Sequence, residues 1–278
     1  MNTQKKQPPV FWLAAAAAVI SLITVLISIF EPSIYGGPIA AGTLTEQNRI
    51  GAIAQDLITI PLALGYMLLL WRYARAGGVK ELIALVGGLG YFLYAFALYS
   101  IEAYYTILYP VYLLIFALCF WGLIYGFLQL KPVLARGSEM PRSTRLSVAT
   151  FLLIVLAVLV PAWLLLMLPL VAAHTPQNAY AVFLLDLTIE FPALAIAAVG
   201  LLRRKAWAGP LSGIMLVKVF TVCISWNFGE VFALTALRST DASLAYISGT
   251  LTLVSVVLLV LYFRGLKVPA AAPVHAGE

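Results

Sequence analysis

Six ionisable side chains lie inside or beside long apolar stretches of this sequence, where a charged group is costly to place. They are Asp56, Glu102, Asp186, Glu190, Lys218 and Glu230. In a lipid bilayer such a group costs a few kcal/mol on insertion scales, so it should face protein or water. Each is therefore a candidate for binding a ligand, holding a cation or exchanging protons.

Glu190 and Lys218 are expected to meet between neighbouring helices near the middle of the membrane. Glu190 follows Asp186 by one helical turn, so the two carboxylates share a face. Lys218 lies about 10 residues, near 15 Å, into its own apolar stretch. Pairing offsets part of the burial cost that either charge alone would carry. The pair is either a structural link between helices or a part of ligand or proton handling.

A polar cavity is predicted in the half of the membrane away from the basic loops, where most of the acidic residues cluster by depth. The residues predicted to bind a ligand or ion are Asp56, Gln55, Asp186, Glu190, Lys218, Glu230, Tyr91 and Tyr94. Grouped carboxylates favour cations or proton-linked chemistry. Tyr91 and Tyr94 lie deep and need hydrogen-bond partners, so they could line the same cavity. For Glu102 the alternative is simple solvation among lipid head groups.

The elements that must position these residues are membrane-spanning helices. The chain is 63% hydrophobic and 10% charged, whereas soluble domains are about half apolar and about a quarter charged. A bilayer core needs about 20 mostly apolar residues per helix. The predicted spans are Val10 to Phe30, Arg49 to Trp71, Leu82 to Ser100, Tyr105 to Leu130, Leu146 to Leu170, Ala179 to Leu202, Leu211 to Leu234 and Leu244 to Phe263. The fold class is an all-α integral membrane bundle of eight transmembrane helices.

Lysine and arginine orient the predicted bundle, because cytoplasmic loops carry the excess of these residues. Every second loop is basic, from Lys5 and Lys6 at the start to Arg264 and Lys267 at the end. Both termini are therefore predicted to be cytoplasmic. The basic residues stand in separate membrane-flanking loops and form no compact patch, which excludes nucleic acid and leaves membrane lipids as partners.

The two halves of the chain resemble each other. Residues 55–64 of the second span are similar to residues 185–194 of the sixth, and the match needs a one-residue gap. Two parallel four-helix repeats, 10–130 and 146–264, are predicted within a single transmembrane domain, followed by a disordered tail, 265–278. The alternative is that an aspartate followed by a proline recurs by chance in leucine-rich helices.

No catalytic residue, cofactor site or metal site is predicted. Neither histidine lies in a span, which argues against a buried histidine metal site or general base. Intramembrane aspartyl peptidases need a Gly-x-Gly-Asp motif, but Gly88-Leu89-Gly90 is followed by Tyr91. Rhomboid-like proteases and retinal proteins are disfavoured by the missing histidine partner and by the span count.

Gln55-Asp56 with Pro61, together with Gly90-Tyr91 and Tyr94, resembles a family of uncharacterised bacterial polytopic integral membrane proteins. The resemblance implies a multi-pass protein of the bacterial cytoplasmic (inner) membrane and implies no activity. On the residues themselves, we expect a permease for a small solute or cation. The alternatives are a membrane enzyme acting on a lipid or lipid-linked substrate and a non-catalytic assembly or sensory subunit.

Overall fold

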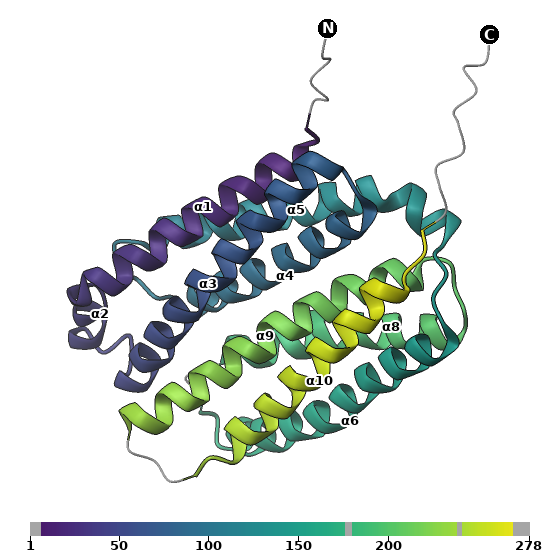
Figure 1. The fold of residues 1–278 in the computed structure, drawn as a ribbon. Helices are drawn as coiled ribbons and strands as arrows, with labels where there is room; N and C mark the ends of the chain where they lie inside the picture. Colours follow the sequence, from purple (N-terminus) through teal and green to yellow (C-terminus); the bar gives the residue numbers. More distant parts are fainter. Residues whose placement is uncertain (1–6, 176–179, 238–240, 269–278) are drawn as a thin grey trace, which may run out of the picture.

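Eight long apolar helices make up most of the structure, a computed structural model that describes residues 7–175, 180–237 and 241–268 (Figure 1). The continuous ones are α1 (Pro9–Phe30), α3 (Glu46–Ala76), α4 (Val79–Ile101), α5 (Tyr109–Arg136), α6 (Arg142–Ala172), α9 (Ala208–Ala236) and α10 (Ser243–Gly265). The sixth spanning helix joins α7 (Tyr180–Leu185), a π-helical turn η2 (Asp186–Glu190) and α8 (Phe191–Leu202). A 3-10 turn, η1 (Pro32–Tyr35), and the short helix α2 (Gly36–Ala40) connect α1 to α3.

All eight helices are long and apolar enough to cross a bilayer, with lengths from 22 to 31 residues. Each predicted span coincides with one of them, and several helices run a few residues beyond the prediction. The fourth span starts later than predicted, at Tyr109 instead of Tyr105, because Pro110 suits the first turn of a helix. The prediction of an all-helical, multi-pass membrane bundle is confirmed.

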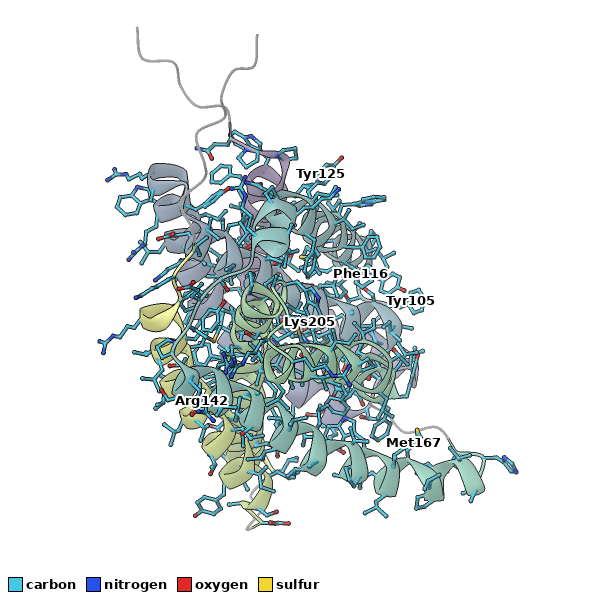
Figure 2. All side chains as sticks on the ribbon, turned by 90° about the vertical axis from the view of Figure 1, so that its right-hand side faces the viewer. Tyr105, Phe116, Tyr125, Arg142, Met167 and Lys205 are labelled. Atoms are coloured by element: carbon cyan, nitrogen blue, oxygen red, sulfur yellow. The ribbon has the colours of Figure 1, made fainter. Side chains whose placement is uncertain are left out.

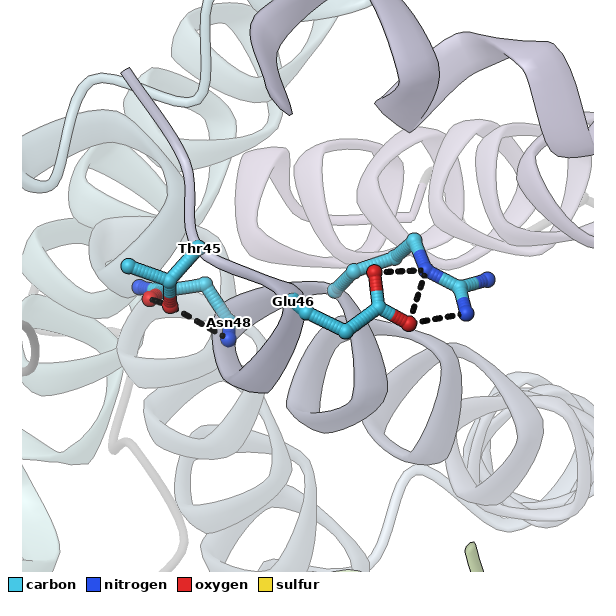
Figure 3. Close-up of polar contacts among 4 residues, drawn as sticks. Thr45, Glu46 and Asn48 are labelled. Carbon is cyan, nitrogen blue, oxygen red and sulfur yellow. Dashed lines mark hydrogen bonds and ion pairs between the residues drawn. The ribbon is translucent and has the colours of Figure 1, made fainter. Parts of the chain in front are cut away.

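Helix α3 shows how local sequence sets the ends of an element. Thr45 is its N-cap, and the Thr45 hydroxyl oxygen accepts a hydrogen bond from the backbone N–H of Asn48 at 3.1 Å (Figure 3). In the first turn Glu46 pairs with Arg49, which places negative charge near the positive end of the helix dipole. Gly77 ends the helix in the left-handed conformation, with φ at 59°.

The helices form two groups of four that lie side by side (Figure 1). In the first group α1 contacts α3 and α5, and α4 also contacts α3 and α5. In the second group α6 contacts α8 and α10, and α9 also contacts α8 and α10. Each group is thus a ring of four helices, and the division falls where the two predicted repeats meet. The duplication itself stays a prediction.

Helix α9 joins the groups by packing against α4 and α3. Glycines on α4 permit the close approach, since a Cβ added to Gly87 would lie 2.6 Å from the Val217 Cβ. A Cβ on Gly90 would lie 3.1 Å from the Lys218 Cγ. The joint between α4 and α9 therefore fixes the depth of Lys218 relative to α4.

The basic loops gather at one end of the bundle, here named the basic end, where α1 begins and α10 finishes. The opposite end, where α3 begins and α9 finishes, is named the far end. At the basic end the backbones of Glu139 and Lys267 exchange hydrogen bonds of 2.9 and 2.8 Å. The tail predicted to be disordered, 265–278, therefore begins in ordered structure. Gly265 is the last residue of α10, and Lys267 belongs to the pair with Glu139. Residues 1–6 and 269–278, including Lys5 and Lys6, lie outside the described residues.

Candidate functional site

A cavity of about 410 Å³ lies mainly in the second group and is closed on one side by α4 of the first. Its lining is mostly aliphatic and aromatic, with tryptophans from α6 and α9 and phenylalanines from α7 and α8. The polar lining residues are Gln55, Tyr91, Tyr94, Asp186, Glu190, Ser225 and Glu230. Six of the eight residues predicted to bind a ligand or ion thus line one cavity, and Lys218 lies directly behind Glu190.

Three carboxylates line this cavity, and none of its described lining residues is Lys, Arg or His. Asp186 is 7% exposed and Glu190 is 9% exposed. The Trp163 indole N–H donates to Asp186 Oδ2 at 2.7 Å, and the Trp226 indole N–H donates to Glu230 Oε1 at 2.8 Å. The lining of the cavity therefore holds acidic groups between aromatic rings and no basic one.

Lys218 places a positive charge behind Glu190, next to the cavity. Its Nζ donates to Glu190 Oε2, so the contact predicted between these residues is confirmed. The same ammonium lies 4.4 Å from the centroid of the Tyr94 ring, within range for a cation–π interaction. Glu190 is thereby paired, whereas no ion pair among the described residues involves Asp186 or Glu230.

A π-helical turn brings Asp186 and Glu190 into the cavity together. The Phe191 amide donates to the Asp186 carbonyl five residues earlier, one residue more than in an α-helix. In α3 Pro61 stands five positions after Asp56, and here Pro192 stands six positions after Asp186. The π turn takes up this extra residue, which is the one-residue gap in the sequence match.

Asp56 does not line the cavity, although it was predicted to share it. It is 2% exposed and accepts from the Tyr35 hydroxyl at 2.8 Å and from the Tyr99 hydroxyl at 2.9 Å. Tyr35 comes from η1, the connection between α1 and α3, and its ring is buried against the carboxylate. The first group therefore encloses its buried aspartate in a tyrosine cage formed by Tyr35 and Tyr99.

Gln55, the neighbour of Asp56, faces the opposite way and reaches the cavity. Its amide donates to the Tyr91 hydroxyl at 2.8 Å, and its carbonyl oxygen accepts from the Ser225 hydroxyl at 2.7 Å. Through Gln55, α3 is tied to α4 and α9 at the wall of the cavity. The two groups are therefore joined by a polar network beside the candidate site.

Replacing Tyr35 with phenylalanine is expected to lower the free energy of unfolding by about 1–3 kcal/mol, because buried Asp56 loses one of its two tyrosine donors. Denaturation of the purified protein in detergent measures this change. Tyr105→Phe is the control, since Tyr105 is 64% exposed. Equal free energies of unfolding for Tyr35→Phe and Tyr105→Phe would contradict a stabilising role of the tyrosine cage.

Glu102 caps α4 at the far end beside a second, smaller cavity of about 340 Å³. The Ala181 amide donates to its Oε1 at 3.3 Å, which links α4 to the start of α7. Burial raises the pKa of Glu102 to about 7, and the hydrogen bond from Ala181 opposes this rise. Glu102 is thus partly buried between the end of α4 and the start of α7.

Glu102 should make stability depend on pH. A carboxyl whose pKa is raised on folding stabilises the native state below its unfolded pKa, and that stability is lost as pH rises to the folded value. Between about pH 4.5 and about pH 7, the melting temperature of the native protein should therefore fall relative to that of Glu102→Gln. If the melting temperatures of the native protein and Glu102→Gln differed by a constant amount across this pH range, a contribution of Glu102 to the pH dependence would be contradicted.

Trp163 and Tyr35, which donate to Asp186 and Asp56, were not predicted from the sequence. Trp163 lies on a helix whose surroundings are otherwise apolar, and Tyr35 lies in a connection. One signal was present, because a tryptophan within a membrane span needs a partner for its N–H. Within the described ranges, no group of three or more His, Cys, Asp or Glu side chains is placed to hold a metal ion.

The chain matches no protein-family model, no curated protein and no solved structure.

Proposed function

We propose that this protein is a permease of the bacterial cytoplasmic membrane that binds a small organic cation in the cavity next to Asp186. The observation that carries the proposal is the acidic lining, with three carboxylates. Lys218 pairs with Glu190 from behind the lining and leaves Asp186 and Glu230 without an ion pair among the described residues. A volume of about 410 Å³ falls in the range of small-molecule sites.

The aromatic lining favours an organic cation over a bare metal ion. The rings of Trp163 and Trp226 have their centroids 6.4 Å apart, and Trp163 also packs edge-on against Phe183 at 6.0 Å. Aromatic faces attract ammonium groups, and rings beside carboxylates are typical of sites for quaternary ammonium ligands. Asp186 and Glu230 supply the negative charge that such a ligand would neutralise.

Transport is supported by where the cavity lies. It is walled by α4 of the first group and by α6, α7, α8 and α9 of the second, beside the joint between the groups. In transporters built from two bundles, the substrate site commonly lies at the interface, and rocking of one bundle against the other exposes it alternately. Movement at the joint between α4 and α9 would act on this site.

Benzyltrimethylammonium and its neutral isostere neopentylbenzene test the binding proposal on the full chain. We expect quenching of tryptophan fluorescence by the cation at concentrations at which the isostere has no effect, because Trp163 and Trp226 line the cavity. Uptake of the radiolabelled cation into proteoliposomes then tests transport. Equal binding of the two compounds would contradict the proposed cation site. Binding of the cation without uptake would contradict the proposed transport.

A further inference from the structure

The far half of α6 is left uncovered by the rest of the protein on most sides. All buried residues of α6 lie between Thr144 and Val155, and none of residues 156–172 is buried. Residues 156–172 also contain no charged, hydroxyl or amide side chain. A helix that is apolar all round and leaves its sides uncovered is suited to hydrocarbon. The cavity thus has one wall made from a helix that stands in the bilayer.

Helices α6 and α10 meet at the basic end and separate toward the far end. At the basic end a Cβ on Gly265 would lie 2.9 Å from the Pro141 Cδ, just before α6 begins. From Arg142 the helix then runs away from α10 toward Met167 (Figure 2). The far half of α6 still reaches the site through Trp163, which donates to Asp186, and through Leu159 and Leu166, which line the cavity.

Two leucines mark the edge of the cavity between the diverging helices. Leu166 of α6 is 54% exposed and Leu244 of α10 is 48% exposed, and both also line the cavity. Residues that line a cavity and are also half exposed border an opening. Because α6 is apolar here on every side, an opening at this place is suited to contact with lipid chains.

We infer that the cavity opens sideways into the bilayer between α6 and α10 and admits a cationic amphiphile. The ammonium head would lie by Asp186 and Glu230, and the alkyl chain would leave past Leu166 and Leu244 into the hydrocarbon. The inference rests on the proposed cation site and adds the class of substrate and its route. A zwitterionic phospholipid fits poorly, because its phosphate would meet the cavity's carboxylates.

An alkyltrimethylammonium series, from butyl to tetradecyl, tests the opening with the full chain in lipid nanodiscs. Each compound displaces radiolabelled benzyltrimethylammonium, and its affinity is expressed relative to its concentration in the membrane. If the chain leaves through the opening, added methylenes stay in hydrocarbon, so affinity should change less than about threefold from octyl to tetradecyl. A closed cavity must exclude the longer chains, and a fall of more than about tenfold would overturn the inference.

Tryptophan substitutions provide the matched variants. Leu166→Trp and Leu244→Trp narrow the opening, and each should weaken binding of tetradecyltrimethylammonium by about tenfold more than binding of benzyltrimethylammonium. Leu165→Trp is the control, because Leu165 is 71% exposed on the same helix and does not line the cavity. Equal effects of Leu165→Trp and Leu166→Trp would contradict the opening.

The same ammonium chemistry could come from a single-chain amphiphile or from a two-chain cationic lipid. Didodecyldimethylammonium, tested beside dodecyltrimethylammonium, distinguishes these sources, and binding of either supports lateral entry. Rejection of both, with benzyltrimethylammonium still bound, overturns the opening alone. Failure of benzyltrimethylammonium itself overturns the proposed cation site.

Discussion

Asp186→Asn is expected to weaken binding of benzyltrimethylammonium by about 10- to 100-fold. The substitution removes the negative charge and keeps the shape of the side chain and an oxygen that can accept from the Trp163 indole. An interaction between a buried carboxylate and a cation contributes about 1.5–3 kcal/mol, which corresponds to that range of affinity. Tryptophan fluorescence titration of the purified variant measures the change.

Asp56→Asn is the matched control for this prediction. It is the same chemical change on the second spanning helix, at a carboxylate enclosed by Tyr35 and Tyr99 outside the cavity. Its affinity for the cation should stay within about twofold of the native value. Equal losses in the two variants would mean that the effect is a general one on the fold. No loss in Asp186→Asn would remove Asp186 as the ligand.

Lys218→Met is expected to lower the free energy of unfolding by about 3–5 kcal/mol, because it leaves the Glu190 carboxylate buried without its cation. The methionine fills a similar volume, so the loss reports the missing charge more than a missing contact. Chemical denaturation in detergent, followed by circular dichroism, measures it. Arg49→Met, which breaks the exposed pair with Glu46, should change stability far less.

The double variant Glu190→Gln with Lys218→Met separates a lost pair from a lost packing contact. Once both charges are gone, no unpaired ion remains, and stability should return to within about 1 kcal/mol of the native value. If the double variant is as unstable as Lys218→Met alone, the lysine acts through packing against Tyr94 and the α4–α9 joint instead of through charge.

The spanning helices and the pair of Glu190 with Lys218 could be predicted because they depend chiefly on depth in the bilayer. Hydropathy along the chain gives the ends of each span, and the distance of a residue from the nearer end gives its depth in the bilayer. Two opposite charges at equal depth on neighbouring helices can meet. Lys218 is a simple case, since about ten residues from the start of a span reach the middle of the membrane.

Asp56 and Asp186 show that depth in the bilayer does not predict the surroundings of a side chain. They lie in similar sequences, yet Tyr35 and Tyr99 enclose the first, while the second lies in a cavity next to Trp163. The difference arises from side chains on other elements and from the direction in which each carboxylate points. Neither is encoded in the local sequence of α3 or of the sixth helix, so a shared cavity was expected where the structure has two separate sites.

The π turn at Asp186 to Glu190 makes the site tolerant of the loss of one residue at this point of the helix. Each residue of an α-helix turns the chain by about 100°. Deleting one codon between Leu187 and Ile189 would allow an unbroken α-helix, and α7 and α8 would keep nearly the same relative rotation, because the wider π turn already absorbs the rotation of the extra residue. Asp186 and Glu190 would then stand three positions apart and Phe183 and Phe191 seven, so each pair would still share a face, and a single in-frame deletion would leave the acids and the rings on the cavity side of the helix.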